Sequence, residues 1–167
     1  MEKVLLSTLL SLTVAALAMA ETPPVVRIPT LSAPMAMELA RATYDDCAAR
    51  GFRVAVAVVG RDGRLVAFLR NPDAGPHTIE TARGKAYSAN TFRAPTTNLQ
   101  AGENRVLMRD IPGALLIGGG LPINLGGFHY GAVGVSGAPS EKTPGDIDDA
   151  CALTGIEAIA DEVEMAD

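Results

Sequence analysis

The segment Phe52–Leu69, FRVAVAVVGRDGRLVAFL, decides how the chain is expected to fold. Its first part, FRVAVAVV, is rich in β-branched residues and almost wholly apolar, which is typical of a buried central strand. The tetrapeptide Arg61-Asp62-Gly63-Arg64 has the composition of a turn, and LVAFL resumes the apolar pattern after it. The segment therefore predicts a β-hairpin at the centre of a sheet.

Helices are expected on both sides of this hairpin. Ser32 can cap a first helix, whose apolar positions alternate with charged ones until Gly51 ends the run. A second helix is predicted to begin at Thr78 or His77, after the loop NPDAGP, and to reach about Phe92. The hairpin should therefore lie between two helices in the chain order.

The remaining elements complete an α+β pattern. A short helix is expected from Pro95, a strand over Ala114–Ile117, and another strand over Tyr130–Ser136. A last helix should start at Asp146, where acidic side chains suit the positive end of the helix dipole. Because strands adjacent in sequence are joined by short turns, the sheet should be mainly antiparallel and covered by helices.

The N-terminus has the features of an export signal. Residues 1–20 hold Lys3, a long apolar run and the small-x-small sequence Ala18-Met19-Ala20, so cleavage is expected after Ala20. Residues 21–31 contain three prolines and predict an extended segment, and 32–167 form one domain. We expect a periplasmic or secreted protein without a membrane span after cleavage. A net charge of −5 without a basic block argues against nucleic-acid partners.

The segment LLIGGGLPI, Leu115–Ile123, contains three consecutive glycines. A Walker loop needs Lys and then Ser or Thr after its last glycine, but Leu121 and Pro122 stand there. A dinucleotide site needs a helix that opens on the glycines, and the residues that follow have the pattern of a strand and a turn. The glycines are better explained by close backbone packing or by a carboxylate-sized anion site.

Imidazole chemistry in this chain must use His77 or His129, the only histidines. His77 is the better candidate, because it follows a Pro/Gly loop and precedes a helix that carries Arg83, Lys85 and Tyr87. The alternative for His77 is a helix-cap residue in solvent. For His129, beside aromatic residues in a Gly-rich turn, a surface or oligomer contact is the simpler explanation.

Other candidates also have a simple structural alternative. Arg83 and Lys85 could bind a carboxylate or could belong to an ordinary charged helix face. Thr97 could hydrogen-bond a ligand near the glycines or only cap a short helix. The two cysteines, Cys47 and Cys151, could form a disulfide in an oxidising compartment or remain as buried thiols.

Three motifs in the second half of the chain carry a resemblance to a known family. GGGLPI (Gly118–Ile123), GAVGVSGAPS (Gly131–Ser140) and DIDDACALTGIEAI (Asp146–Ile159) are similar to the closing half of the GlcG/HbpS family of haem-degrading or haem-binding domains, the DUF336 type. VAVAVVGRDGRLVAFLRNPDA and TARGKAYSANTF resemble its front half. The resemblance implies a profilin-like sandwich with about five strands in a mainly antiparallel sheet, and homo-oligomers.

The resemblance also implies a function, namely binding of haem or a related tetrapyrrole by an exported protein that assists haem degradation. His77 would then be the metal-binding residue, as ligand to the haem iron. Because the family fold places the first and last helices side by side, it also implies a disulfide between Cys47 and Cys151. The expected ligand-binding residues are His77, Arg83, Lys85, Tyr87, Thr97, Gly118, Gly119, Gly120 and Pro122.

Two other functions stay open at this stage. An isomerase, tautomerase or lyase acting on an organic acid could use His77 or Lys85 as a catalytic acid or base. Amides of the glycine loop would then stabilise an enolate or carboxylate oxygen. A non-catalytic sensor or accessory protein is the other alternative.

Overall fold

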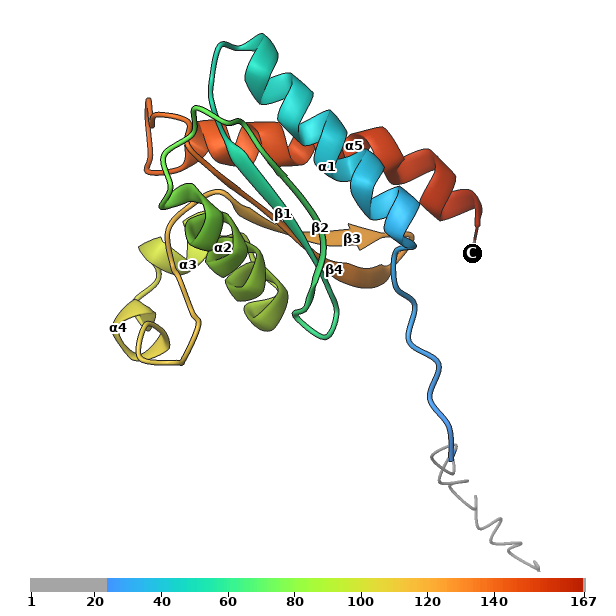
Figure 1. Ribbon diagram of the computed structural model, residues 1–167. Coiled ribbons are helices and arrows are strands. Elements are labelled where there is room, and N and C mark those ends of the chain that lie inside the picture. Colours follow the sequence, from blue (N-terminus) through green and yellow to red (C-terminus); the bar gives the residue numbers. More distant parts are fainter. Residues whose placement is uncertain (1–23, 167) are drawn as a thin grey trace, which may run out of the picture.

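The computed structural model describes residues 24–166 (Figure 1). The predicted signal peptide over 1–20 lies outside the described residues, as does the start of the extended segment over 21–31. No helix within 24–166 is long and apolar enough to cross a membrane. The elements are α1 (Ala33–Ala49), β1 (Ala55–Gly60), β2 (Leu65–Arg70), α2 (Thr78–Phe92), α3 (Thr96–Ala101), α4 (Arg105–Met108), β3 (Gly120–Leu125), β4 (Phe128–Ser136) and α5 (Asp146–Met165).

The hairpin expected in the middle of the chain is formed by β1 and β2. The two strands pair antiparallel, from Ala55 opposite Arg70 to Val58 opposite Ala67. Strand β1 is buried along its whole length, as its apolar sequence predicts. At the start of the chain, the Ser32 hydroxyl accepts a hydrogen bond from the backbone N–H of Met35, at 3.3 Å, and so caps α1.

The described residues form one four-stranded sheet in the order β2-β1-β4-β3, and all three pairings are antiparallel. The predicted α+β class with a mainly antiparallel sheet is confirmed, but the expected number of about five strands was wrong. The strand predicted over Ala114–Ile117 is absent. The backbone N–H groups of this segment do not pair with a strand. The N–H of Leu115 donates to the Ser88 hydroxyl at 2.6 Å, and that of Ala114 donates to the Ile111 carbonyl at 3.0 Å.

Strand β3 starts at the last of the three glycines and runs through Pro122 to Leu125, so the strand pattern expected after the glycines is confirmed. Gly120 pairs with Gly134, and Pro122 pairs with Ala132. A proline has no N–H to donate, but β3 is an edge strand, where only one side needs hydrogen bonds.

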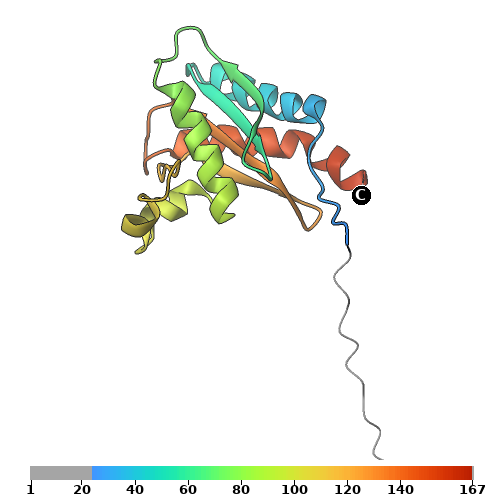
Figure 2. The ribbon, with the colours of Figure 1, turned by 60° about the horizontal axis from the view of Figure 1, so that its bottom comes forward.

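Helices cover both faces of the sheet (Figures 1 and 2). Helices α1 and α5 lie side by side on one face, and α2 lies on the other. The α2 side is packed with small residues, so the helix approaches the sheet closely. A Cβ atom on Gly134 of β4 would lie only 2.1 Å from the Ala82 carbonyl oxygen of α2.

A disulfide joins the two helices on the first face. Cys47 of α1 and Cys151 of α5 are bonded, with Cα atoms 5.5 Å apart, and both are fully buried. The helices also touch through small groups, since a Cβ on Gly155 of α5 would lie 1.9 Å from the Thr43 hydroxyl of α1. The first and last helices are therefore held together covalently and by close packing.

Candidate functional site

The three glycines fill a crowded place where β3 meets α2 and the start of α5. A Cβ on Gly118 would lie 2.2 Å from the Pro144 carbonyl oxygen, and one on Gly120 2.5 Å from the Lys85 carbonyl oxygen. Gly119, with φ of 112°, would place a Cβ 2.7 Å from Lys85 Nζ. Because other atoms occupy the space of these side chains, all three positions require glycine for close packing.

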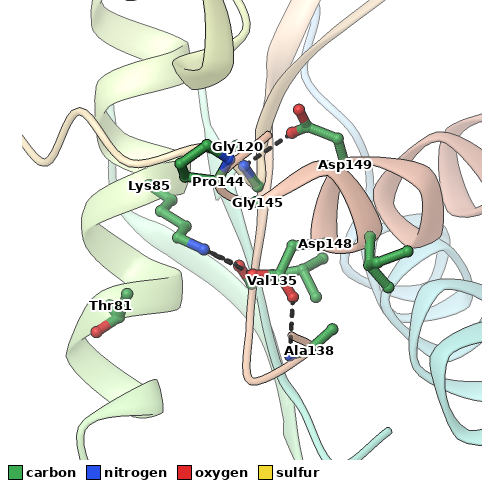
Figure 3. A network of polar contacts seen from close by, with 12 residues as sticks. Thr81, Lys85, Gly120, Val135, Ala138, Pro144, Gly145, Asp148 and Asp149 are labelled. Atoms are coloured by element: carbon green, nitrogen blue, oxygen red, sulfur yellow. Dashed lines mark hydrogen bonds and ion pairs between the residues drawn. The ribbon is translucent and has the colours of Figure 1, made fainter. Parts of the chain in front are cut away.

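Lys85 passes beside these glycines and ends in a buried ion pair (Figure 3). Its Nζ lies 2.7 Å from Asp148 Oδ2 and donates to the Val135 carbonyl at 2.9 Å. Asp148 also accepts a hydrogen bond from the backbone N–H of Ala138 at 3.1 Å. Burial raises the pKa of Asp148, and the contacts with Lys85 oppose that shift. The pair links α2, the end of β4 and the start of α5.

The neighbouring carboxylate, Asp149, receives the amide of the glycine segment. The Gly119 N–H donates to Asp149 Oδ1 at 2.8 Å, and the Thr97 hydroxyl donates to the other oxygen. Burial raises the pKa of Asp149, and these two hydrogen bonds lower it in part. The amide of Gly119 is therefore occupied by a carboxylate of the chain itself, and an anion site for a ligand at these glycines stays a prediction.

Lys85 therefore lies together with Gly118–Gly120 and Thr97, as expected, but in a packed polar network. Its side chain is 3% exposed and lines none of the cavities described below. Pro122 is half-buried on the edge strand and lines none of these cavities either. Roles of Lys85 and Pro122 in ligand binding or catalysis stay predictions.

A first cavity, of about 530 Å³, lies between α2, the β1–β2 turn and the segment before β3. Arg83 and Tyr87 of α2 line it, as does Arg64 of the turn. Val59 and Leu115 provide apolar wall. Ligand pockets commonly have volumes of about 300–1,000 Å³ and combine apolar walls with a few polar groups. Two guanidinium groups and a phenol beside apolar side chains suit a flat or amphipathic acid.

His77 stands outside this cavity at the start of α2. It occupies the N-cap position, makes no side-chain capping hydrogen bond and is exposed. Gly84 lies seven residues later, or two helical turns, so His77 is on the same side of α2 as cavity residues Gly84 and Tyr87. Arg83 is engaged by Glu80, at 3.0 Å, in a pair that is largely exposed. Arg83 and Tyr87 thus line the first cavity, whereas His77 is at the far end of α2 and its ring lies beside Gly75 of the preceding loop.

A second cavity, of about 710 Å³, lies on the other side of the segment Ala114–Leu115, which borders both cavities. Thr97 lines it, with Arg105 and Arg109 from the region of α4. Val106 and other apolar side chains complete the wall. Thr97 is thereby separated from Arg83 and Tyr87, although the sequence interpretation assigned all three to one site.

Several residues of this region were missed from the sequence. Arg64 was assigned only to a turn, and Asp148 only to an acidic helix start. Arg105 and Arg109 had no interpretation, because α4 has only four residues and gives almost no periodic signal. The one available signal was the spacing of Arg105 and Arg109, which places them on one side of a helical turn.

The sheet order and the helices on both faces define an α+β protein of the profilin-like sandwich class. The sequence itself matches the family model "Haem degrading protein HbpS-like" over residues 31–157, and the chain belongs to this HbpS-like family. The expectation drawn from the glycine and GVSG motifs is confirmed.

Solved structures agree with this assignment. A crystal structure of HbpS has 34% sequence identity and a TM-score of 0.75, covering 81% of this chain and 94% of that one. A double mutant of Streptomyces reticuli HbpS has 32% identity and a TM-score of 0.75, covering 88% and 99%. PduOC in complex with heme has 26% identity and a TM-score of 0.67, covering 78% and 96%. Among proteins with curated functions, none matches the sequence.

Proposed function

We propose that this protein is exported and binds haem or a related tetrapyrrole in the first cavity. The observation that carries the proposal is the joint placement of Arg64, Arg83 and Tyr87 around about 530 Å³ with apolar walls. Membership of the HbpS-like family supports it, and so does the similarity to PduOC, whose structure contains heme.

The residues present fit the chemical groups of haem. Guanidinium groups of Arg64 and Arg83 would hold the propionates, because they bind carboxylates in a bidentate manner. Val59 and Leu115 would contact the porphyrin edge. The Tyr87 phenol, or His77 from the open end of the same helix side, would bind the iron. Bound haem would supply redox chemistry at its iron, and the chain would orient it and limit its access to water.

The buried position of Lys85 favours a binding protein over the isomerase or lyase. An acid or base must reach the substrate, and Lys85 Nζ is instead 2.7 Å from Asp148 in a site without cavity contact. We also propose that the protein assists the degradation of the haem that it binds. If bound haem stays intact, a sensor or accessory role is the alternative function.

Export to the periplasm or the medium is part of the same proposal. The signal-like sequence of residues 1–20 supports it, and so does the Cys47–Cys151 disulfide, because disulfides persist in oxidising compartments. Assembly into homo-oligomers is proposed from the family resemblance. Mass spectrometry of the exported protein, with cleavage after Ala20 as the expected result, tests the first point, and light scattering tests the second.

Titration with hemin tests the binding proposal. The expected result is a saturable shift of the Soret band. Arg83→Gln should weaken hemin binding. Tyr87→Phe or His77→Ala, whichever removes the iron ligand, should change the position of the band. Tyr44→Phe is the matched control, because Tyr44 lies on α1 and accepts a hydrogen bond from Asn71 at 3.1 Å, away from the cavity. The absence of any Soret shift in the wild-type protein would reject the proposal. Loss of the band after addition of a reductant and oxygen would indicate degradation.

A further inference from the structure

A separate group of cations surrounds the turn between β1 and β2. Arg61, Arg64 and Arg93 line one cavity of about 680 Å³. The first two belong to the turn, and Arg93 immediately follows α2. Leu65 and Val66, the exposed start of β2, line the same cavity.

This cavity is distinct from the proposed haem site, because Tyr87 and Arg83 do not line it. Arg64 and Leu65 border both cavities.

Little negative charge balances these guanidinium groups. Asp62 also lines the cavity and lies 3.8 Å from Arg64, in an exposed pair. Within residues 24–166, neither Arg61 nor Arg93 has a carboxylate within 4.0 Å. The chain as a whole has a net charge of −5, so this cavity is positively charged in a protein that is negatively charged overall. Unpaired guanidinium groups that meet at one cavity are suited to bind an oxyanion.

The backbone at Arg93 supports a specific role for this residue. Arg93 has φ of 51°, and it is the one non-glycine residue with positive φ in the part of the chain that the structure describes. Glycine or asparagine is usual at such a position after a helix, because a larger side chain costs free energy there. Arg93 occupies this position despite the conformational cost, and its guanidinium group lines the cavity.

We propose that this cavity binds an organic oxyanion with two negative charges next to an apolar group, such as an aryl phosphate. Arg61 and Arg93 would contact the anionic oxygens, while Arg64 would exchange its weak contact with Asp62 for the ligand. The apolar group would lie against Val66. The volume of about 680 Å³ leaves room for more than an inorganic ion.

His129 is connected to this cavity through Asn90, and its pKa responds to the charge of the cavity arginines. Its Nε2 is 2.9 Å from Asn90 Oδ1 and its Nδ1 is 2.8 Å from Asn124 Oδ1. The Asn90 amide N–H donates in turn to the Arg61 carbonyl at 3.2 Å. Burial lowers the pKa of His129, and the charges of Arg93 and Arg61 lower it further. An anion that neutralises these arginines should therefore raise the pKa of His129.

Nuclear magnetic resonance of the two histidines tests the proposal in the purified protein. Phenyl phosphate should bind saturably and raise the pKa of His129, while the ring signals of exposed His77 should not respond to the ligand. Inorganic phosphate should bind more weakly, because it lacks the apolar group. The dicarboxylate phthalate tests whether any aromatic dianion is accepted, and a larger effect than that of phenyl phosphate would overturn the choice of a phosphate. An unchanged His129, or equal binding of inorganic and phenyl phosphate, would overturn the proposal.

Variants separate this site from unspecific charge effects. Arg61→Gln and Arg93→Gly should each weaken phenyl phosphate binding by about tenfold, since each removes a charged hydrogen-bond donor. Arg93→Gly also suits the left-handed backbone, so the fold should be kept. Arg41→Gln on α1 is the matched control, because Arg41 is an exposed arginine 3.8 Å from Asp45 and does not line this cavity. Unchanged affinity in both test variants would reject the site. Because the titration needs no haem, its outcome is independent of hemin binding.

Discussion

Lys85 Nζ and Asp148 Oδ2 lie 2.7 Å apart with their side chains 3% and 4% exposed, and they join α2 to the start of α5. Replacement of Lys85 with Met should leave the Asp148 carboxylate buried without its cation. We expect a loss of about 3–5 kcal/mol in the free energy of unfolding. Urea unfolding followed by circular dichroism measures it, because the chain has no Trp for fluorescence.

A double variant separates the ion pair from simple packing. Lys85→Met with Asp148→Leu removes both charges, so it should be more stable than Lys85→Met alone. If the two losses instead add, the residues contribute independently and the coupling inferred here is wrong.

The glycine segment gives a second prediction. Gly119→Ala should be strongly destabilising, by several kcal/mol, because its Cβ would meet both the Asp148 Cβ and Lys85 Nζ at 2.7 Å. Gly127→Ala is the matched control, since Gly127 has φ of 83° but no atom within 4 Å of an added Cβ. The control should lose only about 1 kcal/mol, the cost of the left-handed backbone. Equal losses in thermal unfolding would mean that backbone conformation, and not packing, explains the glycine.

Much of the fold could be predicted from local sequence. Ser32 and the turn at Asp62 act through neighbours two or three residues away, as their hydrogen bonds show. Strand β1 was evident because burial on both faces leaves an apolar run. The strand after the glycines was also predicted, but only the sheet order shows that β3 lies at the edge, where Pro122 is tolerated.

The site was less predictable because its contacts join distant segments. Lys85 has the sequence context of a charged helix face, and its burial depends on Asp148, 63 residues later. The requirement for glycine at Gly118 depends on Pro144, which lies in the loop before α5 and is 26 residues away in the sequence. Arg83 and Tyr87 could be identified because they share one helix, whereas Arg64 joins them only through the tertiary fold.

Asp149 gives a pH prediction. Its pKa is raised above the ordinary value of 3.8, so between 3.8 and the raised pKa the folded protein binds more protons than the unfolded chain. The contribution of Asp149 to stability should therefore fall as the pH rises through that window. Asp149→Asn keeps an acceptor for Gly119 and should remove this dependence. The measurement is the difference in unfolding free energy between wild type and variant at several pH values.

Asp146 provides the control for that experiment. Backbone N–H groups of Lys142 and then Glu141 donate to its carboxylate and lower its pKa below 3.8. Its contribution is present above 3.8 and is lost as the pH falls through the lowered pKa. Asp146→Asn should therefore change the pH dependence below 3.8 and not above it. The same pH profile for both variants would contradict these assignments.

The disulfide gives a stability prediction that depends on redox conditions. Cys47 and Cys151 are 104 residues apart, so the bond restricts a long loop in the unfolded chain. Reduction should lower the free energy of unfolding by about 4–5 kcal/mol on the chain-entropy model. The test is urea unfolding with and without dithiothreitol, with the double variant Cys47→Ala and Cys151→Ala as the control that should not respond. A wild-type protein that does not respond either would contradict the prediction.

The pairing of Glu80 with Arg83 leads to a prediction about the proposed haem site. Glu80 lines the first cavity and holds the Arg83 guanidinium at 3.0 Å, so its carboxylate competes with any ligand carboxylate. Glu80→Gln frees the guanidinium and removes a repelling charge, and hemin affinity should rise by about two- to fivefold, the range for an exposed ion pair. The gain should shrink at high salt, because exposed charges are screened. Glu38→Gln on the exposed side of α1 is the control, and an affinity that falls in Glu80→Gln would mean that Glu80 itself helps to hold the ligand.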